Sequence, residues 1–306
     1  ENTKKASSKP FKYSQEYWKE TCVSALFYSE VILYSSKNKL NFAEIQNLMT
    51  AQKPLILVVN DDGISAKGIR ALLEVAKPFG EIYVVAPDSP QSGMGHAITI
   101  NSFLRLDPQD FENGVEHEYA CSGTPADCVK IAIQQLLPRR PDLVISGINH
   151  GSNESCNVIY SGTMSAAVEA AIEGIPAIGF SLLDYSAHAD FSYSQDVAKR
   201  VITEVLSKGL PKDICLNVNI PKGKKEELKG IRICRQARGN WKESFDHRQD
   251  PAGKDYYWLT GSFINYDAEE AHADSTALAD GFVSVVPIQF DLTAHKAINE
   301  LKTWNL

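Results

Sequence analysis

The chain has 306 residues, which is enough for one large domain or two small ones. Its 31 Lys and Arg stand against 38 Asp and Glu, and this net charge of −7 argues against a general binder of nucleic-acid backbones, which needs clustered basic residues. Hydrophobic residues make up 43% of the chain and charged residues 23%, so it has enough apolar material for a sizeable core.

The first 48 residues differ in character from the rest. Residues 1–10 are polar, whereas residues 13–48 carry aromatic and aliphatic side chains at roughly helical spacing, which predicts one or two helices. Met49 stands just before a strong strand pattern, and residues 49–306 would form a self-contained chain. We therefore expect residues 1–48 to be an appended segment or the product of a wrongly assigned start.

From residue 54 onward, expected strands alternate with expected helices. The strands are at 55–59, 81–86, 142–146 and 175–180, and the helices are at 68–79, 125–137, 163–173 and 195–206. The first strand is a continuous apolar run, which is typical of a strand buried on both faces, and the second is a further buried strand. The alternation predicts a Rossmann-like α/β/α core over residues 49–229, with a mostly parallel sheet between two helical layers.

The alternation breaks after a strand at 216–220. Residues 230–262 look like extended arms around a turn at 250–253, and a last strand at 282–286 precedes a helix at 292–304. The arms carry Trp241, Phe245, Tyr256, Tyr257 and Trp258. A lone hairpin buries such side chains poorly, and aromatic residues are enriched at protein interfaces. We therefore expect residues 230–306 to mediate an isologous homodimer, or a tetramer of paired dimers.

The six cysteines are scattered and contain no C-x-x-C pair, which excludes the usual zinc-finger and thioredoxin motifs. Scattered cysteines in a chain of this length indicate buried thiols in a reducing compartment. The longest apolar stretch, residues 22–36, is too short to span a bilayer and contains Glu30. We expect a cytoplasmic protein that has neither a membrane nor a nucleic-acid polymer as partner.

Polar, glycine-rich loops follow three of the expected strands. Asp61 and Asp62 come directly after the first strand, Ser92 follows the second, and Asn149 follows the strand at 142–146. In open α/β sheets, ligands bind beyond the carboxyl ends of the strands. Each of these residues alone is more typical of a turn or loop, but together their oxygens suit Mg²⁺ or Mn²⁺. The pattern predicts a divalent-metal site.

A Ser-Gly-Thr sequence opens two of the expected helices, at residues 122–124 and 161–163. Ser and Thr commonly cap helix N-termini, and capping alone is one explanation. The same helix start also cradles phosphate well, because glycine allows the backbone to come close to the ligand. Two such turns at one sheet edge suggest a phosphorylated ligand.

Other site motifs are absent. Gly93-Met94-Gly95 lacks the third glycine of the dinucleotide fingerprint, which disfavours a dinucleotide oxidoreductase. The chain has no G-x-x-x-x-G-K-[ST] phosphate loop and no H-E-x-x-H motif. His96 and His150 lie in the expected site loops, but a single loop histidine is more often a polar surface residue than an acid or base.

Several segments resemble the SurE (survival protein E) family of metal-dependent nucleotidases. They are residues 57–63, 86–88 with 92–93, 123–128, 146–149, 160–163, 216–221, 250–258 and 281–285. The resemblance covers about residues 54–290 in order. It implies a Rossmann-like domain whose protruding C-terminal portion embraces a partner subunit. It also implies divalent-metal-dependent hydrolysis of nucleoside 5′-monophosphates, and in some members of 3′-monophosphates or short polyphosphate.

The resemblance also assigns the site residue by residue. The metal ligands fall on Asp61, Asp62, Ser92 and Asn149, and the phosphate-binding positions fall on Asn153, Ser161, Gly162 and Thr163. One divalent ion per subunit, Mg²⁺ or Mn²⁺, would polarise a phosphoryl oxygen. Asp62 or Asp61 would be the general base. The alternative on the same edge is a non-catalytic, metal-bridged nucleotide-binding module.

Overall fold

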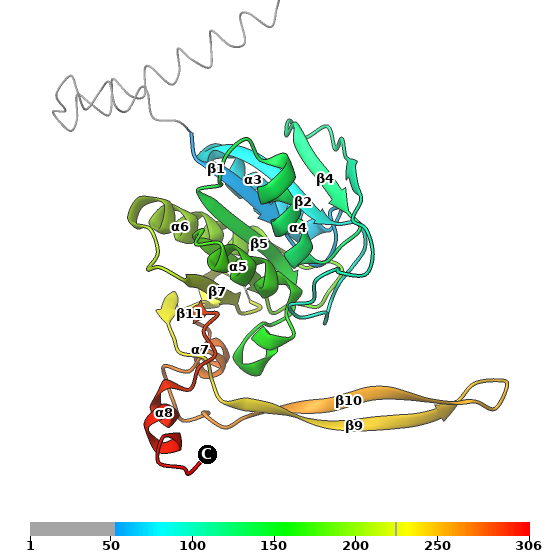
Figure 1. The fold of residues 1–306 in the computed structure, drawn as a ribbon, viewed down its shortest axis with the longest axis vertical. Helices are drawn as coiled ribbons and strands as arrows, with labels where there is room; N and C mark the ends of the chain where they lie inside the picture. Colours follow the sequence, from blue (N-terminus) through cyan, green and yellow to red (C-terminus); the bar gives the residue numbers. More distant parts are fainter. Residues whose placement is uncertain (1–52, 224) are drawn as a thin grey trace, which may run out of the picture. The chain divides into compact units, whose positions relative to one another are not determined.

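A nine-stranded sheet forms the centre of the protein, for which a computed structural model describes residues 53–223 and 225–306 (Figure 1). Its strands are β1 (Leu55–Val59), β2 (Glu81–Pro87), β3 (Leu106–Pro108), β4 (His117–Cys121), β5 (Leu143–His150), β6 (Ala177–Leu182), β7 (Ile214–Ile220), β8 (Ile231–Ile233) and β11 (Val283–Gln289). They lie in the order β3-β4-β2-β1-β5-β6-β7-β11-β8. The six strands from β4 to β7 are mutually parallel, whereas β3 and β11 run antiparallel to their neighbours β4 and β7.

Helices cover both faces of this sheet. The α-helices are α3 (Lys67–Ala76), α4 (Pro125–Ile131), α5 (Gly162–Ile172), α6 (Ser192–Lys208), α7 (Asp274–Ala279) and α8 (His295–Leu301). Short 3-10 turns are η1 (Lys77–Phe79), η3 (Ser155–Ile159) and η4 (Lys225–Glu227), and a π-helical turn, η2 (Ala132–Leu136), extends α4. The mostly parallel α/β fold predicted from the sequence is thus confirmed. The helices expected within 13–48 lie outside the described residues.

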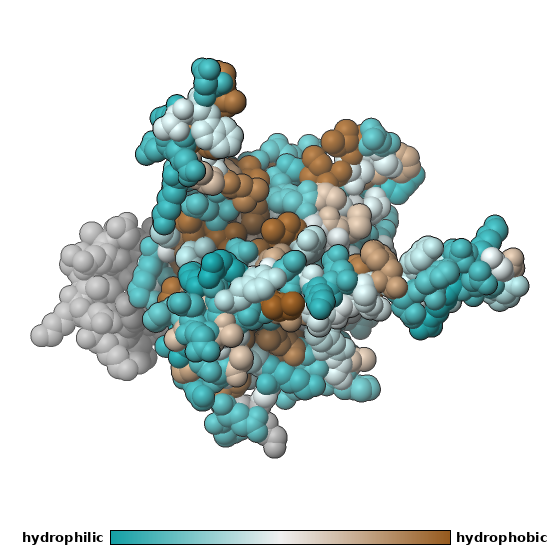
Figure 2. Space-filling view, turned by 90° about the horizontal axis from the view of Figure 1, so that it is seen from below, coloured by the Kyte–Doolittle hydropathy of each residue, from teal (hydrophilic) through white to brown (hydrophobic). Residues whose placement is uncertain are grey.

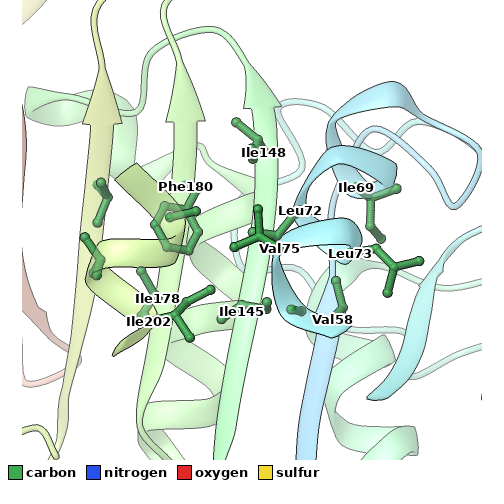
Figure 3. Close-up of a cluster of buried hydrophobic side chains, with 14 of the residues drawn as sticks. Val58, Ile69, Leu72, Leu73, Val75, Ile145, Ile148, Ile178, Phe180 and Ile202 are labelled. Carbon is green, nitrogen blue, oxygen red and sulfur yellow. The ribbon is translucent and has the colours of Figure 1, made fainter. Parts of the chain in front are cut away.

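Two hydrophobic clusters hold the three layers together. Ile56 and Val58 of β1 pack in the cluster that includes α3 and α6, which Figure 3 shows in part. Leu55, Leu57 and Val59 pack in the opposite cluster, with α4 and α5. All five side chains are fully buried. Because successive strand residues point to opposite faces, a strand covered on both faces must be apolar throughout.

The strand order reverses beside β1. The chain passes from β1 to β2 and β4 on one side, and then returns to place β5, β6 and β7 on the other side. Open α/β sheets bind ligands at such a switch point, beyond the carboxyl ends of the strands. Asp61 and Asp62 follow β1, and Asn149 lies at the carboxyl end of β5. The fold therefore brings these three residues to the switch point.

The C-terminal portion contributes both to this sheet and to a separate hairpin. Strands β9 (Gly239–Gln249) and β10 (Asp255–Asn265) pair antiparallel along their whole length and extend away from the sheet (Figure 1). Residues 231–233, expected in the arm, instead form β8 at the edge of the main sheet, parallel to β11. The expectation was wrong for this segment because Ile231 packs against the core cluster that includes α6.

Two further expectations concern membranes and thiols. No helix in the described ranges has the length and apolar character needed to cross a membrane. The five cysteines within those ranges are free thiols, and four of them are buried: Cys121, Cys128, Cys215 and Cys234. The expectation of buried thiols holds for these four.

Candidate active site

Two adjacent carboxylates follow β1 and contact different elements. Asp61 is 3% exposed, and its Oδ1 accepts a hydrogen bond from Thr163 Oγ1 at 2.5 Å. Asp62 is half-buried, and its Oδ2 accepts a bond from the backbone amide of His150 at 3.3 Å. Asp61 is thereby joined to the first turn of α5, and Asp62 to the end of β5. The edge is built from three elements distant in sequence.

The electrostatics of this pair favour a bound cation. Burial raises the pKa of Asp61 from 3.8 to about 6; the Thr163 hydrogen bond opposes this rise and the neighbouring Asp62 charge adds to it. Burial likewise raises the pKa of Asp62, against the opposing effect of the His150 amide. Two adjacent carboxylates, one buried and one half-buried, are stabilised when a cation neutralises them. The pair therefore fits a divalent metal.

Neutral oxygens must complete any such site. Within residues 53–223 and 225–306, no group of three or more His, Cys, Asp or Glu side chains is gathered in a way that could hold a metal. A hard cation accepts carbonyl and hydroxyl oxygens alongside carboxylates. The donor set of two carboxylates with amide and hydroxyl groups is consistent with Mg²⁺ or Mn²⁺ and does not suit a soft metal.

Asn60 supplies such an oxygen, and sequence reasoning missed it. Its side chain is 1% exposed, and Nδ2 donates to the carbonyl of Gly63 at 2.8 Å. Its Oδ1 is buried without a hydrogen-bond partner. A buried acceptor left unpaired is costly, so this oxygen beside Asp61 suits an absent positive ligand. The available signal was a polar residue placed between a fully buried strand and the Asp-Asp pair.

Ser92 lies in the loop over residues 88–105, which connects β2 to β3. The preceding residue, Gln91, donates its backbone amide to the carbonyl of Asp61 at 2.8 Å. This bond fastens the loop to the end of β1. Ser92 itself is exposed, so the structure brings its backbone to the site edge and leaves its hydroxyl open to solvent.

Asn149 lies where β5 is irregular. The register between β5 and β6 shifts between Ser146 and Asn149. Gly147 adopts φ +122°, and a Cβ there would lie 2.3 Å from the carbonyl oxygen of Phe180, so only glycine fits. The Asn149 side-chain nitrogen donates to the carbonyl of Gly151 at 3.1 Å. The residue after Asn149 is the one whose amide bonds Asp62.

The start of α5 meets Asp61 directly. Ser161 is the N-cap, and its hydroxyl accepts from the amide of Met164 at 3.0 Å, so capping explains this residue. Thr163 is fully buried, and its hydroxyl donates to Asp61. A Cβ on Gly162 would lie 2.6 Å from the Cβ of Asp61, so only glycine permits this approach. The Ser-Gly-Thr turn thus caps α5 and also binds the Asp61 carboxylate.

The second Ser-Gly-Thr turn is closed from within the protein. Thr124 caps α4, its amide donates to Asp127 Oδ2 at 2.9 Å, and its hydroxyl accepts from the Asp127 amide at 3.2 Å. A Cβ on Gly123 would lie 2.8 Å from the same carboxylate. Asp127 already supplies the negative charge at this helix start. The suggestion that both turns hold phosphate is therefore corrected to one turn.

Asn153 belongs to a buried amide network at the ends of β6 and β7. Its backbone amide donates to Asn219 Oδ1 at 2.8 Å, and its carbonyl accepts from Asn217 Nδ2 at 2.7 Å. Its side-chain nitrogen donates to Ser181 Oγ at 2.8 Å. Asn217 and Asn219 hold the Asn153 backbone, and their signal in the sequence was Asn at alternate positions of an otherwise apolar strand.

The two loop histidines bond to groups other than the aspartates. His96 Nε2 lies 2.8 Å from Glu169 Oε2, and His150 Nδ1 lies 3.2 Å from the carbonyl of Asp184. His150 also packs edge-on against Phe191. His150 bonds Asp62 through its backbone amide, and its ring lies near enough for its charge to oppose the rise in the Asp62 pKa, whereas His96 bonds Glu169.

Fold and site together define an open, doubly wound α/β protein with a hard-oxygen edge beside a helix N-terminus. The model of the family "Survival protein SurE" matches residues 56–243, more than half of the chain. The protein named 5′-nucleotidase SurE of Flavobacterium psychrophilum is 63% identical over 254 residues, covering 83% of this chain and 98% of that protein. The Christiangramia forsetii protein of the same name is 62% identical over 259 residues, covering 84% and 99%.

A solved structure agrees with these matches. The crystal structure of the SurE protein from Aquifex aeolicus superposes with a TM-score of 0.71 at 40% sequence identity, covering 82% of this chain and 99% of that one. The chain belongs to the SurE family. The resemblance drawn from its motifs is thereby confirmed.

Proposed function

We propose that this chain is a divalent-metal-dependent phosphomonoesterase that hydrolyses nucleoside 5′-monophosphates to nucleoside and phosphate. Nucleoside 3′-monophosphates and short polyphosphate are further candidate substrates. The observation that carries the proposal is the bond from Thr163 to the buried Asp61, which joins an oxygen-rich sheet edge to a helix N-terminus. The relatives named 5′-nucleotidase SurE support the substrate class.

The metal would be held by Asp61, Asp62, Ser92 and Asn149, and the orphaned Oδ1 of Asn60 makes it a fifth candidate. When bound, a Mg²⁺ or Mn²⁺ ion supplies Lewis-acid polarisation of a phosphoryl oxygen. The buried Asp61 and the half-buried Asp62 would supply the negative charge that binds the ion.

The first turn of α5 would hold the phosphate. The first amides of a helix have no intrahelical partner and carry the positive end of its dipole. Ser161 takes the amide of Met164 and Asp61 takes the backbone amide of Thr163, which leaves the amide of Gly162 for a phosphate oxygen. Asn153, held by the network at β6 and β7, would be a further phosphate contact.

Asp62 is our candidate for the general base that takes a proton from the attacking water. Asp61 is 3% exposed and has one oxygen bonded to Thr163. Asp62 is more exposed, so water reaches it more readily. A positioned carboxylate within hydrogen-bond reach of water contributes typically about 10²- to 10⁴-fold to the rate.

The hairpin suggests that the active form is a homodimer. Large hydrophobic side chains of the hairpin are between 59% and 65% exposed: Phe245, Tyr257, Trp258 and Leu259. Figure 2, viewed from the end where the hairpin and α8 lie, shows further hydrophobic residues gathered across the middle of that face. Contiguous exposed apolar surface marks interaction sites. Light scattering should give at least twice the chain mass, and a monomer at micromolar concentration would contradict the dimer.

We also place the enzyme in the cytoplasm and treat residues 1–48 as appended to a core at 49–229, followed by the assembly region 230–306. Free buried thiols support the reducing compartment. Fractionation of cells expressing the full chain tests the compartment, and recovery in a membrane or secreted fraction would refute it.

The direct test of activity is phosphate release from AMP and GMP, with Mn²⁺ present and with chelator present. We expect release only with metal. The competing class, a non-catalytic nucleotide-binding module, predicts metal-dependent nucleotide binding without release. Binding measured by calorimetry under the same conditions therefore separates the two.

A further inference from the structure

A charged cluster outside the carboxylate pair fastens the loop over residues 88–105. His96 of this loop contacts Glu169 Oε2 at 2.8 Å, and Lys130 of α4 donates to Glu169 Oε1 at 2.6 Å. Glu169 lies on α5 and is 2% exposed. Because a carboxylate only accepts, the His96 ring donates through Nε2.

The loop needs such a fastening near Ser92. Gly93 and Gly95 adopt φ +77° and +57°, a region that glycine enters freely, so the backbone there restrains itself weakly. The other hydrogen bonds of this part of the loop use its backbone. The amides of residues 91 and 95 donate to the carbonyls of Asp61 and Tyr160, and the carbonyl of residue 97 accepts from the Thr124 hydroxyl. Within residues 92–97, all of them described, His96 is the side chain that makes an ion pair or hydrogen bond.

Glu169 is well suited to hold the histidine. Burial raises its pKa, but the hydrogen bonds from His96 and Lys130 lower it by more, so the pKa lies below its ordinary value. Glu169 is therefore a carboxylate at neutral pH. Hydrogen bonds to a charged acceptor are stronger than neutral ones, so the contact between Glu169 and His96 is a strong one.

The same helix thus touches the site from two directions. Thr163, in its first turn, bonds Asp61, and Glu169 bonds the loop that carries Ser92. Six residues separate the two positions, which is about 9 Å along a helix axis. A helix is rigid over that length, so α5 fixes the position of the loop relative to the Asp61 carboxylate.

We propose that Glu169 is a positioning residue that acts through His96, setting where Ser92 stands relative to Asp61 and thereby the affinity for the divalent metal. The proposal rests on the proposed function, because Ser92 is relevant here only as a metal ligand. The nucleotide and the reacting water do not contact Glu169 in this account.

The test compares His96→Ala with Lys130→Met. Lys130→Met removes the other partner of Glu169 and leaves the contact between His96 and Glu169 in place. Mn²⁺ affinity of the full chain is measured by electron paramagnetic resonance of unbound Mn²⁺, and kcat for AMP is measured at saturating Mn²⁺. Losing a group that orients a metal ligand typically weakens metal binding about tenfold or more. We expect about that loss for His96→Ala, with kcat at saturating metal within about twofold.

Lys130→Met should lower the melting temperature and leave Mn²⁺ affinity near that of the wild type. His96→Gln, which restores a donor at similar reach, should recover most of the affinity. If His96→Ala does not fold, His96→Leu takes its place, since it restores apolar volume without a donor and carries the same expectation.

The outcomes distinguish a failure of the proposed function from a failure of the role of Glu169. A wild type without Mn²⁺-dependent phosphate release refutes the proposed function itself. A wild type that passes, together with a folded His96→Ala or His96→Leu that binds Mn²⁺ as tightly, overturns the role of Glu169. Equal weakening in Lys130→Met also overturns it, because that result indicates a general loss of stability.

Discussion

Replacing Asp61 by Asn should stabilise the metal-free protein at alkaline pH. Asp61 is 3% exposed, and burial raises its pKa from 3.8 to about 6, so the metal-free fold holds the charged form unfavourably. Asparagine has nearly the same shape, and its side-chain oxygen still accepts the bond from Thr163. The change removes a buried charge and keeps the local packing.

The sign and size follow from proton binding. Between pH of about 4 and 6 the native state holds the Asp61 proton and the unfolded chain has released it, so native stability falls as pH rises through this window. A shift of about two pKa units corresponds to about 3 kcal/mol. At about 2–4 °C per kcal/mol for a domain of this size, Asp61→Asn should melt roughly 6–12 °C higher above the window.

The assay is thermal unfolding in chelator at pH 4 and pH 8, with Asp107→Asn, at an exposed carboxylate of β3, as the matched control. We expect the gain for Asp61→Asn at pH 8, most of it gone at pH 4, and little change in the control at either pH. Added Mn²⁺ should raise the melting temperature of the wild type and leave Asp61→Asn unmoved. A lower melting temperature for Asp61→Asn at pH 8, or an equal shift at both pH values, would refute the reasoning.

Three further changes probe the same edge and the chain around it. Thr163→Val removes a hydrogen bond to a charged group worth roughly 1.5–3 kcal/mol, so kcat/KM for AMP should fall about ten- to a hundredfold; Thr163→Ser should restore it, and unchanged kinetics would leave Thr163 a structural residue. Gly162→Ala would place a methyl group 2.6 Å from the Cβ of Asp61, so calorimetry should show weaker Mn²⁺ binding and turnover should fall on AMP and GMP alike; a loss confined to one base would contradict this. Because residues 54–306 form one compact unit, a chain of residues 49–306 should fold and retain phosphate release; insoluble or inactive protein would show that the first 48 residues belong to the core.

The sequence predicted the central layers well because their burial is written into every strand position. The run of residues 55–59 is apolar throughout since α3 and α4 cover its two faces, and the polar residues after it mark the switch point. Strand β4 was not predicted because it contains Glu118. That side chain is 2% exposed only because Arg70 and Asn113 bond it from elsewhere in the chain.

The candidate site was predicted in part for a similar reason. Asp61, Asp62 and Thr163 follow from motifs, but the bond between Asp61 and Thr163 spans 102 residues and depends on the fold. Asp127 closing the second Ser-Gly-Thr turn could have been predicted, because Thr followed three residues later by an acidic residue is a capping pattern. The pairing of His96 with Glu169 had no local signal, since 73 residues separate them.

Metal-dependent hydrolysis at the Asp61–Asp62 pair is tested by measuring phosphate release from AMP by the wild type and by Asp62→Asn, each stripped with chelator and then supplied with Mn²⁺. We expect that stripping abolishes release by the wild type, that Mn²⁺ restores it, and that Asp62→Asn stays inactive although it is folded. Full activity of Asp62→Asn after the same treatment, or release by the stripped wild type, would contradict the assignment of metal-dependent hydrolysis to this edge.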